Sequence, residues 1–168
     1  MKFLTLALCA TASAALAASP SLVNGDFEKE LSSWQVWGGV VTPAAHGGKF
    51  AVQITNKAPT WSGVDQVIDI PTGTKKVKIS GWIKGDSIKP GKEKWELGRI
   101  AIEFRDAKTE MVGGYPPVVG ELVGTKAWTK VEHTYDIPAG AASIKLQCAL
   151  GNTVGTVTCD DIALEYSK

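Results

Sequence analysis

Lys76–Lys84, KVKISGWIK, alternates apolar and polar residues along its whole length. Val77, Ile79 and Ile83 fall on one side of this pattern, and the lysines and Trp82 fall on the other. A period of two predicts a β-strand, because successive side chains of a strand point to opposite faces of its sheet. The pattern therefore predicts a strand with one face in a hydrophobic core and one face in solvent.

The same alternation recurs through most of the chain, and no segment keeps an apolar period of 3.6 residues. The 18 glycines and 8 prolines suit many turns and argue against long helices. About nine short strands predict an all-β fold, a two-sheet β-sandwich of the jelly-roll type. The further strands are expected at 22–28, 34–41, 50–55, 63–70, 99–105, 130–137, 143–150 and 155–166.

The composition limits the classes of partner. The chain has 168 residues, which suits one domain, and it balances 18 Lys and Arg against 17 Asp and Glu. A nucleic-acid backbone needs a basic surface, so we expect no nucleic-acid partner. No segment after the N-terminus approaches the roughly 20 apolar residues of a membrane span, so we also expect no membrane partner. We expect a monomer.

Residues 1–17 have the layout of a secretory signal peptide. A basic start, Met1-Lys2, precedes an apolar run and then small residues that end at Ala15-Leu16-Ala17. Cleavage after Ala17 leaves a single domain, 18–168, and a secreted protein, extracellular or periplasmic. The alternative is that the apolar run forms a buried first strand.

Export would leave two cysteines in an oxidising compartment, Cys148 and Cys159. If 143–150 and 155–166 form a hairpin around Asn152–Gly155, the register can place the two cysteines opposite each other, within disulfide range. We therefore predict a disulfide between Cys148 and Cys159. The alternative is two buried free thiols on strands that do not pair.

Several aromatic rings lie where core packing does not require them. Trp82 and Trp95 share parity with charged neighbours, and Trp61 and Tyr115 stand in or beside turns. Sugar rings present C–H-rich faces that stack on indole, with hydroxyl groups at their edges. We predict that these rings and Arg99 contact a carbohydrate, whereas each ring could instead cover a core edge or close a loop. Trp34, Trp37 and Trp128 stand beside small residues at strand starts and are interpreted as structural.

Five groups of residues resemble a known family. They are Leu22-Val23-Asn24-Gly25-Asp26-Phe27-Glu28 with Trp34, then His46-Gly47-Gly48-Lys49-Phe50-Ala51-Val52, Trp61-Ser62-Gly63, Gly124-Thr125-Lys126-Ala127-Trp128, and finally Gly155-Thr156-Val157-Thr158-Cys159-Asp160-Asp161-Ile162-Ala163-Leu164. In order and spacing they are similar to CenC-like carbohydrate-binding modules of families 4, 9 and 22, with a galactose-binding-like jelly roll. The resemblance implies a non-catalytic module that binds polysaccharide in a groove on a concave sheet and is often attached to a glycoside hydrolase.

The resemblance also implies roles for single residues. Trp61 corresponds to a groove platform, Gln147 to a residue of the facing strand, and Gln66 to another groove position, although alternation puts Gln66 on the core face. The same fold commonly carries a structural calcium ion. Here its ligands would be the side chains of Glu28 and Asp160 and the carbonyl groups of Asp26 and Lys49, and His46 replaces an acidic ligand. The alternative is that backbone N–H groups satisfy Asp160.

Two other functions remain open from the sequence. A small jelly-roll glycoside hydrolase would need two carboxyl groups about 5–9.5 Å apart, and Glu103 with Glu132 is the candidate pair. An extracellular adhesion or matrix protein would instead use the exposed tryptophans as a flat patch for another protein. The glycan itself is not specified, because β-glucan, xylan, mannan and galactan all offer faces for stacking.

Overall fold

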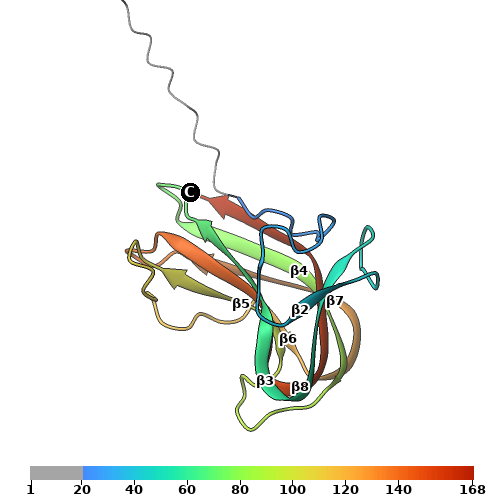
Figure 1. Cartoon of the computed structure of the whole chain (residues 1–168). Coiled ribbons are helices and arrows are strands. Elements are labelled where there is room, and N and C mark those ends of the chain that lie inside the picture. Colours follow the sequence, from blue (N-terminus) through green and yellow to red (C-terminus); the bar gives the residue numbers. More distant parts are fainter. Residues whose placement is uncertain (1–20) are drawn as a thin grey trace, which may run out of the picture.

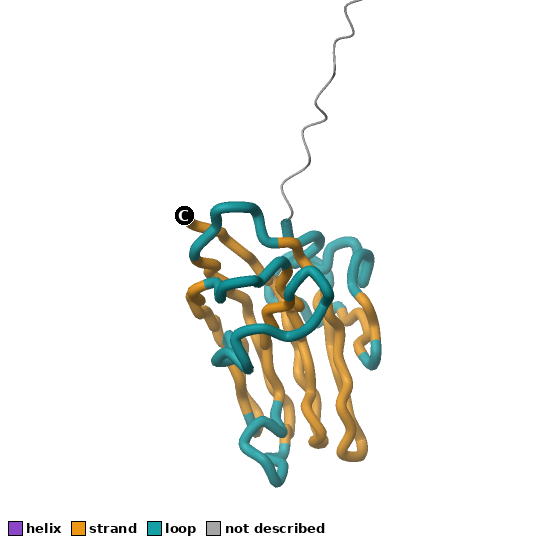
Figure 2. The backbone as a smooth tube through the Cα atoms, turned by 90° about the vertical axis from the view of Figure 1, so that its left-hand side faces the viewer, coloured by secondary structure: helices purple, strands orange, loops and turns teal. Residues whose placement is uncertain are grey.

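The structure is a computed structural model that describes residues 21–168, so the predicted signal peptide and its cleavage point lie outside the described residues. The described chain contains strands and loops (Figure 2) and confirms the all-β prediction. It has eight strands: β1 (Gln35–Val36), β2 (Gly39–Thr42), β3 (Ala51–Asp69), β4 (Lys76–Ile88), β5 (Gly98–Arg105), β6 (Gly120–Leu122), β7 (Gly124–Asp136) and β8 (Ser143–Ser167).

Two long antiparallel strands, β3 and β8, form the spine of the fold (Figure 1). They pair from Val52 opposite Cys159 to Asp69 opposite Ser143, with irregular register between Asn56 and Ser62. Such irregularities bend a strand and increase its twist. Each strand can therefore pass from one layer of the sandwich into the other.

Each half of this spine recruits its own neighbours. Layer A consists of 62–69 of β3 and 143–151 of β8, with β1 beside β3 and with β5 and then β6 beside β8. Layer B consists of 51–56 of β3 and 155–167 of β8, with β2 beside β3 and with β4 and then β7 beside β8. The sandwich therefore has two outer faces, one on each layer.

The core fills the space between the layers. The predicted alternation of 76–84 is correct, since Val77, Ile79 and Ile83 are fully buried while Trp82 lies on the other face of β4. Leu146 on β8 and Ile100 on β5 bury the inner face of layer A in the same way. Full burial of each such side chain contributes about 1.5–3 kcal/mol, so these faces hold the two layers together.

The predicted first strand, 22–28, is wrong, because these residues form turns. The N–H of Ile162 on β8 donates to the carbonyl of Gly25 at 2.8 Å. A Cβ at residue 25 would lie 2.1 Å from the carbonyl oxygen of Ile162, so only glycine fits there. The turn thus packs the start of the domain against its last strand. Trp34 is buried against Phe27, as its structural interpretation requires.

Five other predicted segments differ from the observed strands. The segment 34–41 is split into β1 and β2, whereas 50–55 and 63–70 join in β3, and 143–150 and 155–166 join in β8. The predicted hairpin around Asn152–Gly155 is therefore wrong. The chain continues there along β8, which pairs with β3 on both sides of the bend.

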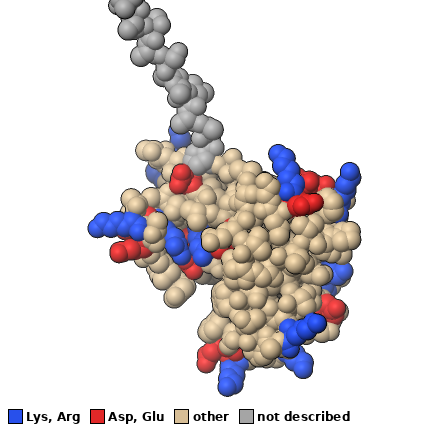
Figure 3. All heavy atoms as spheres, in the orientation of Figure 1, with Lys and Arg blue, Asp and Glu red and all other residues tan. Residues whose placement is uncertain are grey.

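The surface mixes both signs of charge. On the face shown in Figure 3, Lys and Arg lie next to Asp and Glu around the periphery, and a broad central area lacks charged side chains. No helix among the described residues is long and apolar enough to cross a membrane.

Candidate carbohydrate-binding face

Layer A carries a hollow of about 760 Å³ on its outer face. Register places Gly63, Ala149 and Arg99 in one row across β3, β8 and β5, and Asp65, Gln147 and Ala101 in the next. The small residues of these rows leave room above the sheet. The hollow is lined by Trp61, Trp95, Arg99, Ala101, Ile102, Glu103, Tyr115, Pro116, Pro117, Val118, Glu121 and Gln147.

Two tryptophans form the aromatic wall of the hollow. Trp61 projects from β3 where the register with β8 is irregular, and it is 39% exposed. Trp95 is 45% exposed, and its ring lies 5.7 Å from that of Trp61 at an angle of 50°. The two rings therefore meet as an angled pair.

The loop that carries Trp95 is held by the residue after it. The carboxylate of Glu96 is buried and accepts hydrogen bonds from the side chain of Asn152 and the backbone N–H groups of Lys92 and Glu93. These bonds, the one from Asn152 first, lower the pKa of Glu96. Since Glu96 adjoins Trp95 in the chain, this network holds the backbone that carries the Trp95 ring.

Arg99 packs its guanidinium against Trp61, with Cζ 4.6 Å from the ring centroid. A cation over an indole face is an attractive arrangement. Burial lowers the pKa of Arg99, and the charges of Glu121 and Glu103 oppose that shift. Its Nε is buried without a hydrogen-bond partner among the described residues. One face of Trp61 is thus occupied by Arg99, and a ligand would contact the rest of the indole.

A polar network lies on the floor of the hollow. The amide of Gln147 donates to Oε1 of Glu103 at 3.1 Å, and Arg105 donates to Oε2 of Glu103 at 2.7 Å. Gln147 is buried on the outer face of β8, as the sequence predicted. Gln147, Glu103 and Arg105 thus form a connected set of polar groups beneath the two rings.

The structure thus brings five of the seven predicted ligand residues to one hollow: Trp61, Trp95, Arg99, Tyr115 and Gln147. It places the other two elsewhere. Gln66 lies on the core side of β3, buried, and exchanges two hydrogen bonds of 2.9 Å with the backbone of Val23. The prediction that Gln66 lines the groove is therefore wrong, and the alternation that put it on the core face is correct.

Trp82 lies on the outer face of layer B, away from the hollow. The ring of His46 stacks on it, 3.8 Å between centroids, and Trp128 meets His46 edge-on at 5.7 Å. Nδ1 of His46 is 2.7 Å from a carboxylate oxygen of Asp161. The prediction that Trp82 shares a face with Trp61 is wrong, because the two strands belong to different layers.

Sequence reasoning missed Trp37, which it interpreted as structural. The Trp37 ring is nearly parallel to that of Trp61, at an angle of 7° and a centroid distance of 6.3 Å. Its Nε1 donates to Asp65 at 2.8 Å, and Lys145 lies 3.5 Å from the same oxygen. Gly63 was an available signal, because glycine within a strand often marks a close approach of another group.

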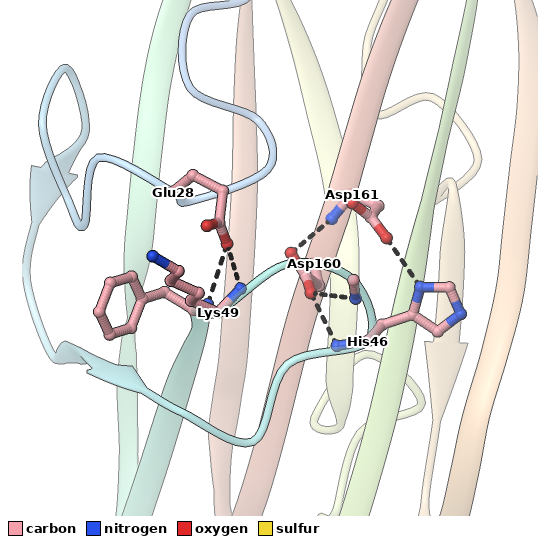
Figure 4. Close-up of polar contacts among 7 residues, drawn as sticks. Glu28, His46, Lys49, Asp160 and Asp161 are labelled. Carbon is pink, nitrogen blue, oxygen red and sulfur yellow. Dashed lines mark hydrogen bonds and ion pairs between the residues drawn. The ribbon is translucent and has the colours of Figure 1, made fainter.

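The two predicted calcium-ligand side chains reach one loop, 46–50 (Figure 4). Oε1 of Glu28 accepts the N–H groups of Lys49 and Phe50, which lower the pKa of Glu28. Asp160 is fully buried and accepts three backbone N–H groups, those of His46, Gly47 and Asp161. Burial nevertheless raises the pKa of Asp160.

The side chains of Glu28 and Asp160 are the kind of ligand that calcium binds, but two side chains supply fewer ligands than calcium needs. Calcium binds six to eight oxygen ligands. Within residues 21–168, no group of three or more His, Cys, Asp or Glu side chains converges on one point. A calcium ion at this place would have to take most of its protein ligands from carbonyl groups, such as those of Asp26 and Lys49.

Cys148 and Cys159 both lie on β8, fully buried. They are not cross-strand partners of each other, since Cys148 pairs with Val64 and Cys159 with Val52. The thiols are unbonded, but they lie within hydrogen-bonding reach, and burial together with this contact raises the pKa of Cys148. The contact therefore crosses the bend of β8 and links layer A to layer B.

Comparisons with known proteins agree with this fold. The structure of TmCBM61 in complex with β-1,4-galactotriose is 23% identical, with a TM-score of 0.61, over 89% of this chain and 100% of that one. The CBM22-1 xylan-binding domain of Paenibacillus barcinonensis Xyn10C is 20% identical, with a TM-score of 0.60, over 90% and 99%. These similarities establish the fold, a jelly-roll β-sandwich.

A third similar structure is the enzymatically active domain of tailspike protein 4 of Bacteriophage CBA120, at 15% identity and a TM-score of 0.66. This chain is covered over 89% of its length but spans only 22% of the tailspike chain. No curated protein sequence matches this chain. The sequence profile of the family described as "Carbohydrate binding domain" matches residues 19–155, so the chain belongs to this carbohydrate-binding domain family.

Proposed function

We propose that the outer face of layer A binds a neutral polysaccharide without cleaving it. The observation that carries this proposal is the hollow between the Trp61–Trp95 pair and the polar floor of Gln147 and Glu103. Indole faces bind the C–H face of a sugar ring, and floor groups of this kind bind the hydroxyl groups at its edge. Such a combination of apolar surface and few convergent polar groups is typical of small-molecule sites.

The charges around the hollow favour a neutral glycan. Arg99 and Arg105 lie beside Glu103 and Glu121, and the Arg105–Glu103 pair is direct at 2.7 Å. The positive and negative side chains are equal in number. An anionic polysaccharide would meet as much repulsion as attraction, whereas hydroxyl groups can donate to the carboxylates and accept from the arginines.

Glu103 and Glu132, the candidate carboxyl pair of the hydrolase alternative, lie on different layers. Glu103 lies on the outer face of layer A, where Gln147 and Arg105 bind it. Glu132 lies on β7 in layer B, 3.2 Å from Lys78. Carboxyl groups on two opposite outer faces cannot flank one glycosidic bond. The adhesion alternative required a flat aromatic patch, and the rings of Trp61 and Trp95, which meet at 50° beside a hollow, favour a glycan instead.

The proposal includes the setting in which the domain works. The leader-like residues 1–17 support export, which agrees with a polysaccharide ligand outside the cell. We also propose that Glu28, Asp160 and the carbonyl groups of Asp26 and Lys49 hold a calcium ion that clips the first turn to β8. The buried carboxylate of Asp160, which has no cationic side chain among its hydrogen-bond donors, supports this proposal.

Native-gel affinity electrophoresis tests the binding. Soluble β-1,4-galactan, xylan, mannan and β-glucan are cast in separate gels, and we expect at least one to retard the wild-type domain. Trp61→Ala should abolish the retardation. A parallel assay measures reducing sugar released from the retarding polysaccharide. Release that scales with protein concentration and disappears in Glu103→Gln would overturn the non-catalytic proposal.

A further inference from the structure

We infer that the chain has a second ligand site, at the bend of β3 and β8, which binds an anionic group of a polysaccharide, a carboxylate or a sulfate. The site is formed by Pro59 of β3, 89–92 and Glu96 of the loop between β4 and β5, and 152–154 of β8, and is called the loop hollow below. The inference goes beyond the proposed function, because the loop hollow is separate from the hollow of layer A and takes a different class of ligand.

The loop hollow has a volume of about 460 Å³ and lies at the end of the sandwich opposite the C-terminus (Figure 1). Sites for small ligands commonly have volumes of about 300–1,000 Å³. Pro59, Pro90 and Val154 give the lining apolar surface, and Lys89 and Lys92 are its exposed cationic residues. The loop hollow therefore combines surface for the C–H face of a sugar ring with two positive charges.

Backbone hydrogen bonds hold the loop against the bend of β8. The N–H of Lys89 donates to the carbonyl of Val154 at 3.0 Å, and Oγ1 of Thr153 donates to the carbonyl of Lys89. Within the loop, the N–H of Gly91 donates to the carbonyl of Glu96 at 3.0 Å. The frame of the loop hollow is therefore formed before any ligand binds, which lowers the entropic cost of binding.

The acidic residue of the lining, Glu96, does not neutralise these lysines. Its carboxylate accepts hydrogen bonds from the side chain of Asn152 and from the backbone N–H groups of Lys92 and Glu93. Among residues 21–168, no ion pair of 4.0 Å or less includes the ammonium group of Lys89 or of Lys92. A concave surface that carries charge of one sign concentrates ions of the other sign. The loop hollow therefore favours an anionic ligand.

The composition of the lining favours an acidic sugar over a nucleic acid. Proteins that bind single-stranded nucleic acid stack its bases on aromatic side chains. None of the described residues that line the loop hollow is aromatic. Two lysines are also few for a phosphate backbone, whose binding depends on the number of neutralised phosphates. An acidic sugar uses both parts of the site, since its ring contacts the apolar walls and its anionic group accepts hydrogen bonds from the lysines.

Binding to immobilised charged polysaccharides tests this site. Polygalacturonate supplies carboxylates and dextran sulfate supplies sulfates, and fully methyl-esterified polygalacturonate and dextran are their uncharged counterparts. We expect the wild type to bind at least one charged polymer more tightly than its counterpart, and to lose most of that difference between ionic strengths of about 0.01 M and 0.15 M. The arm that binds identifies the anionic group.

A double variant, Lys89→Gln with Lys92→Gln, removes both cations. It should weaken binding of the charged polymer at least about fivefold at low ionic strength. The hydrogen bonds of both residues use backbone atoms, so the loop should keep its path. The matched control, Lys76→Gln with Lys78→Gln, removes the same charge from layer B, where these lysines pair with Asp136 and Glu132. It should bind the charged polymer as wild type does, and melting temperatures establish that both variants are folded.

The outcomes separate this inference from the proposed function. Wild-type affinity in the Lys89 and Lys92 variant, or an equal loss in the layer B control, would show that no site lies in the loop hollow. Loss of charged-polymer binding in Trp61→Ala would place the anion in the hollow of layer A and overturn the inference. Equally tight binding of a single-stranded nucleic acid would show that the ligand class is wrong. If no neutral polysaccharide retards the wild type but charged-polymer binding depends on Lys89 and Lys92, the proposed function fails and this inference stands.

Discussion

The outer faces of the two layers carry the same kinds of residue in different arrangements. Layer A presents Trp37, Trp61 and Trp95 beside a hollow with a polar floor. On layer B, the loop before β3 places His46 against Trp82 and Trp128. Both faces put tryptophan among charged residues of a strand, so strand parity alone cannot tell them apart.

The difference lies in what covers the rings. The face of Trp82 is taken by the imidazole of His46, whose Nδ1 is in turn 2.7 Å from Asp161. On layer A, Gly63 lies against the ring of Trp37 and Gly151 against the ring of Trp61, and a hollow lies beside Trp61. A tryptophan on the solvent-facing side of a strand is thus a candidate ligand platform only where no loop of the same chain already stacks on it.

Replacing one tryptophan on each outer face by alanine should give the largest difference in polysaccharide affinity. Trp61→Ala should lower polysaccharide affinity by about 2–4 kcal/mol, because it removes a central aromatic contact of the proposed site. Trp82→Ala should leave affinity unchanged and should lower the melting temperature, because it removes the ring on which His46 packs. Calorimetric titration and thermal unfolding of both variants test this pair. A loss of affinity in Trp82→Ala without unfolding would place ligand on layer B.

Calcium binding at loop 46–50 should raise the stability of the folded domain. A cation that binds only the folded state at a hundredfold excess over Kd stabilises by about 2.7 kcal/mol. For a domain of this size, the melting temperature should rise by roughly 5–10 °C between excess EDTA and millimolar calcium. Polysaccharide affinity should not change, since loop 46–50 lies on layer B and the hollow on layer A.

Glu28→Gln is the matched variant for this experiment. The glutamine keeps one oxygen that can accept the N–H groups of Lys49 and Phe50, and it loses the charge and the second oxygen that a calcium ion would use. The calcium response should shrink in Glu28→Gln. Equal melting temperatures of the wild type in both buffers would remove the metal and leave backbone hydrogen bonds as the only partners of Glu28 and Asp160.

The sequence was sufficient for the fold class because alternation depends on local burial. It predicted the faces of 76–84 and of 143–150 correctly, including the outward Gln147. It could not show that 143–150 and 155–166 are one strand, because Gly151 and Gly155 suit a turn and a bend equally well. Assignment of Trp82 to the wrong layer has a similar cause, since parity gives the face of a strand and pairing gives its layer.

The oxidation state of Cys148 and Cys159 decides whether a covalent bond joins the two layers. We predict that export oxidises Cys148 and Cys159 to a disulfide, because their buried thiols already lie within hydrogen-bonding reach. A bridge over so short a loop stabilises by about 2–3 kcal/mol. Intact mass should rise by about two daltons when the exported protein is reduced. An unchanged mass would show two free thiols, and polysaccharide affinity should be the same in either state.

The smallest effect should come from uncovering the rings of layer B. His46→Ala removes the imidazole from Trp82 and Trp128 and the contact with Asp161, which should lower the free energy of unfolding by about 1 kcal/mol. The backbone N–H of residue 46 remains to donate to Asp160, so the loop should keep its path. Denaturant unfolding measures the loss, and calorimetric titration should give the wild-type polysaccharide affinity. Among the described glycines of layer B, none lies against an indole as Gly63 and Gly151 do in layer A, so an uncovered Trp82 alone should not bind glycan. A second binding event in His46→Ala, retained when Trp61 is also replaced by alanine, would show that coverage by His46 was the whole difference between the two faces.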